Sequence, residues 1–237
     1  MLEAIGIGRR AADRRLLGNI SLSIRAGQRL ALAGPSGSGK TVLLRALALL
    51  DPIDTGEVRW RGNIVPGGEI PRFRSRVMFL AQRPALPEGS VEDILRQPFS
   101  LRVHRNRRFQ RRRIVRWLRT LGRPEDFLAK QQHDLSGGEA QLTALLRAIQ
   151  LDPDILLLDE PTAALDAETA GMAEALVAAW FEDQSGQGRA SVWVSHDREQ
   201  IGRVSSAVFH LRDGLIRRLA EKNIPNCAGF SSRFKAQ

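Results

Sequence analysis

The sequence is organised around one glycine-rich stretch, which reads Gly34-Pro35-Ser36-Gly37-Ser38-Gly39-Lys40-Thr41. It fits the pattern Gly, four residues of any type, then Gly-Lys-Ser/Thr, which defines a phosphate-binding P-loop. The apolar run 30–33 before it predicts a buried strand, and the Leu- and Ala-rich run 42–50 after it predicts a helix. A strand, a loop and a helix in this order are the context that the motif requires.

The chemistry of this loop is phosphate binding. Glycines let the backbone fold tightly with its N–H groups pointing inward, and a helix N-terminus adds partial positive charge where a phosphate sits. We expect residues 34–41 to hold the phosphates of ATP, with Lys40 reaching the β- and γ-phosphates. The Thr41 hydroxyl is expected to ligate Mg²⁺.

The bulk composition is that of a soluble globular protein. The chain has 237 residues, of which 43% are apolar and 26% charged, enough to bury a proper core. No apolar run approaches the roughly 18 residues needed to span a bilayer, and the N-terminus does not read as a signal peptide. We therefore expect a cytoplasmic location. Cys227 is the only cysteine, which excludes an intramolecular disulfide and a cysteine-based metal site.

The formal charge of +10 is concentrated in one segment. Residues 102–123, called the arginine segment below, contain no acidic residue and ten arginines, at positions 102, 105, 107, 108, 111, 112, 113, 116, 119 and 123. The rest of the chain is therefore neutral. Three interpretations stay open: a solvated helix face, a surface for anionic lipid headgroups or an acidic partner loop, and a surface for phosphates.

Short strands are predicted in the first third of the chain. Residues 2–7 and 20–24 are apolar runs, and the second alternates Ile and Leu with Ser. Residues 57–60 and 77–80 predict two more strands. Gln82 follows the last of these almost at once.

The composition then changes, and residues 90–149 are helical in character. This region closes with the sequence Leu-Ser-Gly-Gly-Glu-Ala-Gln at 135–141. Ser136 and Glu139 stand at capping-box spacing, so a helix is predicted to begin here. Its apolar face is formed by Leu142, Leu145, Leu146 and Ile149.

A second candidate catalytic feature is a pair of carboxylates. Asp159 and Glu160 directly follow the all-apolar run 155–158, which predicts a buried strand. Beside a P-loop, Asp159 can hold Mg²⁺ directly or through water, and Glu160 can polarise the water that attacks the γ-phosphate. Asp166 then leads into an Ala-rich helix that reaches Phe181.

The last third predicts further strands. Residues 191–194 form a strand that ends in Ser195-His196, and 208–211 with 215–219 predict a hairpin around Asp213-Gly214. Residues 184–188 are a polar loop, and we expect the polar tail after Ala220 to be disordered.

Together these motifs resemble one family. The run 135–141 is similar to the signature motif of ATP-binding cassette (ABC) ATPases, and the other motifs stand in that family's order. The resemblance implies an α/β fold: a P-loop NTPase core with a mixed central sheet, an N-terminal antiparallel β part and an inserted helical subdomain. We expect one ABC ATPase domain over 1–219, followed by the tail 220–237. Within it, 1–89 and 150–219 form the nucleotide-binding core, and 90–149 the helical subdomain.

The resemblance also implies how the motifs are used. Two copies form a head-to-tail homodimer with two ATP molecules at the interface, each between the P-loop of one copy and Ser136, Gly137 and Gly138 of the other. Gln82 contacts Mg²⁺ and the attacking water, and His196 contacts the γ-phosphate. Asp166 links the two sites.

The sequence departs from this family at two places. Members usually carry an N-terminal aromatic residue that stacks on adenine, but this chain has no tyrosine and no aromatic residue in 7–15. Two alternatives follow: Arg9 or Arg10 stacks on adenine instead through its planar guanidinium, or adenine is loosely held and base selectivity is weak. Leu142 also stands where many relatives have arginine.

The family resemblance implies two classes of function. The favoured one is the energising subunit of a membrane transporter, peripheral on the cytoplasmic face of the membrane and docked on separate transmembrane permease subunits. The other is a soluble ABC ATPase that acts on nucleic acid or ribosomes. It is disfavoured because the chain has one cassette and no coiled-coil insertion. Within transporters, residues 81–86, 97–99 and 193–197 resemble the iron-efflux type, with importers of amino acid or phosphate and lipoprotein systems as alternatives.

Overall fold

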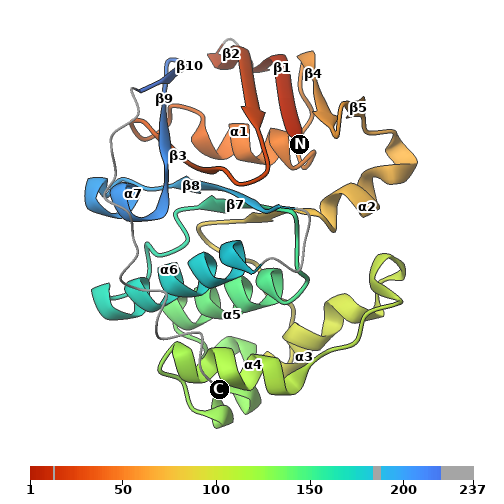
Figure 1. The fold of residues 1–237 in the computed structure, drawn as a ribbon, viewed down its shortest axis with the longest axis vertical. Helices are drawn as coiled ribbons and strands as arrows, with labels where there is room; N and C mark the ends of the chain where they lie inside the picture. The colour runs from red at the N-terminus through yellow and green to blue at the C-terminus, as the bar shows by residue number, and fades with distance from the viewer. Residues whose placement is uncertain (13, 184–187, 220–237) are drawn as a thin grey trace.

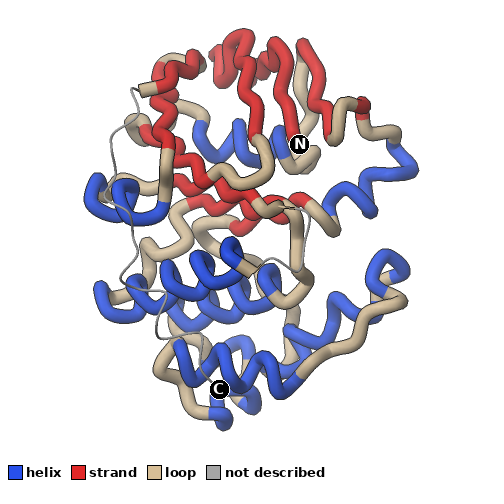
Figure 2. The backbone as a smooth tube through the Cα atoms, in the orientation of Figure 1, coloured by secondary structure: helices blue, strands red, loops and turns tan. Residues whose placement is uncertain are grey.

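The computed structural model contains two β-sheets with helices between and beneath them (Figure 1, Figure 2). It describes residues 1–12, 14–183 and 188–219. The first sheet has the strand order β2-β1-β4-β5. Its strands are β1 (Leu2–Ala11), β2 (Arg14–Ile24), β4 (Thr55–Trp60) and β5 (Asn63–Ile64). Every pairing within it is antiparallel.

The second, central sheet has the order β10-β9-β3-β8-β7-β6. Its strands are β3 (Arg29–Ala33), β6 (Val77–Leu80), β7 (Ile155–Asp159), β8 (Ala190–Val194), β9 (Ala207–Arg212) and β10 (Leu215–Arg218). All neighbours pair in parallel except β9 and β10, which form the predicted hairpin. The predicted fold class, an α/β fold with a mixed central sheet and an antiparallel N-terminal part, is confirmed.

Seven α-helices occur within the described residues. They are α1 (Lys40–Leu47), α2 (Ile70–Arg74), α3 (Val91–Arg96), α4 (Arg111–Thr120), α5 (Gly137–Ile149), α6 (Ala167–Glu182) and α7 (Arg198–Val204). Five 3₁₀ turns join them: η1 (Gly67–Glu69), η2 (Gln97–Ser100), η3 (Arg102–His104), η4 (Glu125–Ala129) and η5 (Gln132–Asp134). The stretch from α3 to α5 is therefore only partly α-helical. The predicted polar tail lies outside the described residues, as does most of the predicted loop 184–188.

Two strands are longer than the sequence predicted, and one helix begins earlier. Strands β1 and β2 extend beyond 2–7 and 20–24 because their arginine-rich ends also pair, as in Arg9 with Leu17 and Arg10 with Arg15. These residues do not alternate apolar with polar, so periodicity did not mark them as strand. Helix α1 begins two residues before the predicted Val42, directly at the end of the P-loop.

Two hydrophobic cores flank the central sheet. The first fills the space between the antiparallel sheet, α1 and one face of the central sheet, and includes Leu2, Leu43 and Val192. The second lies on the opposite face, where α5 and α6 pack beneath the sheet and α3 and α4 beneath them (Figure 1). It includes Leu118 and Leu146. The helical region thus shares a core with strands β6, β7 and β8.

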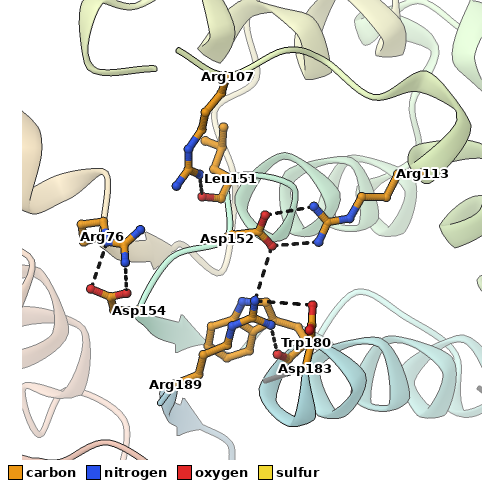
Figure 3. A network of polar contacts seen from close by, with 9 residues as sticks. All are labelled: Arg76, Arg107, Arg113, Leu151, Asp152, Asp154, Trp180, Asp183 and Arg189. Carbon is orange, nitrogen blue, oxygen red and sulfur yellow. Dashed lines mark hydrogen bonds and ion pairs between the residues drawn. The ribbon is translucent and has the colours of Figure 1, made fainter. Parts of the chain in front are cut away.

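A polar network fastens α4 to the central sheet (Figure 3). Arg113 of α4 donates two hydrogen bonds, of 3.0 and 2.8 Å, to the Asp152 carboxylate just before β7. The buried Arg189, at the entry to β8, lies 3.6 Å from both Asp152 and Asp183. Arg107 donates to the Leu151 carbonyl. Two residues of the arginine segment therefore hold the helical region against the core.

We expect Asp152→Asn to lower the free energy of unfolding by about 1–2 kcal/mol, because it removes the charge that Arg113 and the buried Arg189 share. Asparagine tolerates the left-handed backbone of this position, where φ is 43°. Urea unfolding measures the change, with Glu69→Gln in the exposed Glu69–Arg72 pair as control. Equal stability of both variants would show that the network contributes little.

Candidate functional site

The functional motifs meet at one edge of the central sheet. Strands β3, β8, β7 and β6 are parallel neighbours, so their carboxyl ends lie side by side. The P-loop follows β3 and Gln82 follows β6. Asp159 is the last residue of β7 and Glu160 the next, and His196 follows β8. The carboxyl edge of a parallel sheet is where α/β proteins place their ligands.

The P-loop leaves the start of α1 open. Helices α3, α5, α6 and α7 each have a side-chain N-cap, whereas α1 begins at Gly39 with none. Gly39 has φ 100°, and a Cβ placed there would lie 2.6 Å from the Leu16 carbonyl oxygen, so no other residue fits without strain. The first N–H groups of α1 therefore face the loop without a side-chain acceptor, which is the arrangement that binds phosphate.

Lys40 supplies the positive charge of the loop. Its Nζ donates hydrogen bonds of 2.9 and 3.0 Å to the carbonyl oxygens of Gly34 and Pro35. Burial lowers the pKa of Lys40, while Glu160 and Asp159 act in the opposite direction. The ammonium thus sits between the loop backbone and two carboxylates.

Thr41 and Asp159 form the second pair. The Thr41 hydroxyl donates a 2.7 Å hydrogen bond to Asp159 Oδ2, joining residues that are 118 positions apart in the sequence. Burial raises the pKa of Asp159, and the hydrogen bond from Thr41 and the charge of Lys40 lower it in part. A hydroxyl beside a carboxylate is an oxygen donor set that suits Mg²⁺.

Glu160 lies between the other two predicted catalytic side chains. Gln82 Nε2 donates to Glu160 Oε2 at 2.8 Å, and His196 Nε2 lies 3.0 Å from Oε1. The backbone of Glu160 is left-handed, with φ 47°, which is uncommon for a residue with a side chain. Strain of this kind persists where the surrounding structure fixes a functional group.

The signature residues lie apart from this group. Ser136 accepts a hydrogen bond from the Glu139 N–H, and the Glu139 carboxylate accepts one from the Ser136 N–H, so the predicted capping box is confirmed. Gly138 packs against the next loop, where a Cβ would lie 2.8 Å from the Ala164 carbonyl oxygen. No hydrogen bond between described residues connects Ser136, Gly137 or Gly138 to the P-loop of the same chain. Asp166 caps α6 by accepting from the Thr169 N–H at 2.8 Å.

Two neighbours of the site were missed by the sequence prediction. Gln141 of α5 is buried and donates a 3.4 Å hydrogen bond to the Ala81 carbonyl, next to Gln82. Arg14 donates a 3.1 Å hydrogen bond to the Gly37 carbonyl of the P-loop. Residue type and spacing do not predict these contacts, because each contact joins two segments that meet only in the folded chain.

Comparison with known proteins agrees with this geometry. The family model described as "ABC transporter" matches residues 17–163. The chain belongs to the ABC transporter ATPase family. Members of this family are ATPases that hydrolyse ATP to power transport, so the predicted enzyme class is confirmed. Among the described residues, no helix is both long and apolar enough to cross a membrane.

The names of individual relatives differ in the direction of transport, export or import. The chain is 32% identical over 208 residues to "Probable iron export ATP-binding protein FetA" of Escherichia coli, covering 88% of this chain and 90% of that protein. It is 34% identical to "Fe(3+) ions import ATP-binding protein FbpC" of Serratia marcescens, covering 94% and 63%. A dimeric ATP-binding cassette in a post-hydrolysis state bound to ADP and Pi superimposes with a TM-score of 0.80 at 27% identity, covering 93% and 98%.

We expect Lys40→Ala to weaken ATP binding by about ten- to a hundredfold, because it removes the cation next to the phosphate-binding loop. Equilibrium titration with a fluorescent ATP analogue measures the loss. The exposed Arg217→Ala, on β10, is the control for a simple loss of charge. Equal affinities for the two variants would contradict a phosphate role for Lys40.

Proposed function

We propose that this chain is the Mg²⁺-ATP-hydrolysing subunit of a membrane transporter and that it works as a head-to-tail homodimer on separate transmembrane permease subunits. The observation that carries this proposal is the single cluster in which Lys40, Thr41 and Asp159 meet Glu160 with its partners. These contacts support the proposal that phosphate binding, metal binding and water activation take place at one site.

The residues divide the chemistry as follows. The P-loop residues 34–41 bind the phosphates, with Lys40 as their cation. Thr41, Gln82 and Asp159 would hold Mg²⁺, which neutralises the charge that develops on the phosphates when bound. Glu160 acts as the base that orients the attacking water, and His196 contacts the γ-phosphate.

The second half of each site comes from the other copy. Ser136 to Gly138 stand at the start of α5, and no hydrogen bond between described residues connects them to the P-loop of the same chain. The dimeric cassettes among the solved relatives support a second copy as their partner. Asp166, next to the signature loop, links the two sites across that interface.

The transported substrate is proposed from likeness. The relative named for iron export matches over nearly its whole length, which supports metal (iron) efflux. Relatives named for import of ferric ions, sulfate or peptides support an importer as the second candidate. A soluble ATPase acting on nucleic acid or ribosomes has no supporting relative among these.

The test is affinity purification of the Glu160→Gln protein with ATP from detergent-solubilised cells, followed by mass spectrometry. We expect a polytopic membrane protein to copurify, and its identity to narrow the substrate. Ribosomal proteins or nucleic acid without a membrane protein would overturn the transporter proposal.

We expect Glu160→Gln to keep ATP affinity within about threefold while turnover falls at least a hundredfold, because the amide keeps the shape but loses the base. Steady-state hydrolysis and nucleotide titration on the same preparation separate the two effects. Brisk hydrolysis by this variant would refute Glu160 as the base.

A peripheral membrane location is supported by three arginines on α4. Arg112, Arg116 and Arg119 follow helical spacing and are exposed, and their side chains make no hydrogen bond or ion pair with any described residue. By contrast Arg107 and Arg113 contact Leu151 and Asp152. Arg111 contacts Glu92 and Glu125, so the arginine segment is only partly a free surface. We propose that the three free arginines face anionic lipid.

We expect the triple change of Arg112, Arg116 and Arg119 to Gln to reduce sedimentation with vesicles containing anionic lipid by at least tenfold, since each basic residue near such a surface contributes about 1 kcal/mol. The matched control changes three exposed arginines outside the segment: Arg25, Arg212 and Arg217. Equal loss in both triple variants would leave net charge alone as the cause.

A further inference from the structure

The start of β2 runs along the P-loop. The Leu16 carbonyl oxygen approaches Gly39 so closely that a Cβ there would lie 2.6 Å away. Two residues earlier, Arg14 Nη2 donates a 3.1 Å hydrogen bond to the Gly37 carbonyl. A guanidinium on this strand therefore sits against the loop whose N–H groups bind phosphate.

The Arg9 and Arg15 side chains of this hairpin contact other parts of the chain. Arg9 donates to the Pro52 carbonyl and lies 4.0 Å from Asp54. The backbone N–H of Arg10 donates to Asp54 at 2.6 Å, which fixes this part of β1 to the same loop. The Arg15 side chain covers Gly18. The contacts of the Arg9 side chain give no support to the expectation that it stacks on the base in place of an aromatic residue. The contact of Arg10 is made by its backbone N–H. Arg14 is the arginine of this hairpin whose side chain contacts the P-loop.

The hairpin also has no aromatic side chain that could stack on a purine base. Residues 2–24 contain no Phe, Trp, Tyr or His. Arg14, in contrast, has five N–H donors, and one of them makes its hydrogen bond to Gly37. Guanidinium donors match phosphate oxygens in geometry and charge, so the remaining donors suit the triphosphate.

We propose that Arg14 binds the phosphates of the nucleotide, and that this chain holds nucleoside triphosphates by charge with little discrimination between bases. This inference rests on the proposed function and adds a phosphate-binding residue to its site. Because Arg14 is exposed, its contribution depends on ionic strength. Base contacts made by hydrogen bonding or stacking would not show that dependence to the same degree.

The experiment measures dissociation constants of ATP, GTP, UTP and inorganic tripolyphosphate for the full chain, Arg14→Gln and Arg15→Gln. The last is the matched control, because neighbouring residues of a strand point to opposite faces. For the unaltered chain we expect the three nucleotides to bind within about threefold of one another. Arg14→Gln should weaken all four ligands by about five- to tenfold and flatten the salt dependence of ATP binding, and Arg15→Gln should do neither.

Three results would overturn the inference: equal effects of the two variants, a loss for nucleotides without a loss for tripolyphosphate, or ATP affinity more than about tenfold above that of GTP and UTP in the unaltered chain. The second would mean that Arg14 stacks on the base. Failure of the proposed function is distinguishable from all three, because the unaltered chain would then bind no nucleotide with an affinity that depends on Lys40.

Discussion

The placement of one lysine and two carboxylates at the end of four parallel strands is the constraint on which this structure depends. Lys40, Asp159 and Glu160 reach the same edge only because β3 and β7 flank β8 in one parallel sheet. Burial disfavours the charge on Lys40 and on Asp159, and each favours the charge on the other. The cores on both faces of the sheet fix the strands that carry these groups. Fold and chemistry are therefore determined by the same packing.

Two exceptions to local rules lie at the site. Glu160 adopts a left-handed backbone, and α1 starts without a side-chain cap, while α3 and α5 both have complete capping boxes. Such exceptions cost stability and are usually kept for function. Here the first exception aims a carboxylate at Gln82 and His196, and the second keeps N–H groups available for phosphate.

Much of this arrangement could be predicted from the sequence, because the motifs are local. The P-loop, the capping box of Ser136 and the strand that ends at Asp159 are each encoded by residues close together in the chain. The contacts that could not be predicted join distant segments. Arg14 reaching Gly37 and Arg113 reaching Asp152 depend on how β2 and α4 pack, which neither periodicity nor composition encodes. The same holds for the arginine segment: composition marks it as one patch, but some of its arginines make internal contacts while others are exposed, among them Arg112, Arg116 and Arg119 on α4.

The central claim is that one copy carries half of each site and a second copy completes it. Size-exclusion chromatography with light scattering on the Glu160→Gln protein tests this most directly, with and without Mg²⁺-ATP. The account predicts a monomer without nucleotide and a dimer with it, and a monomer under both conditions when Ser136→Glu is added, because that carboxylate would repel the γ-phosphate of the partner's nucleotide. A Glu160→Gln protein that binds ATP and stays monomeric would contradict the account.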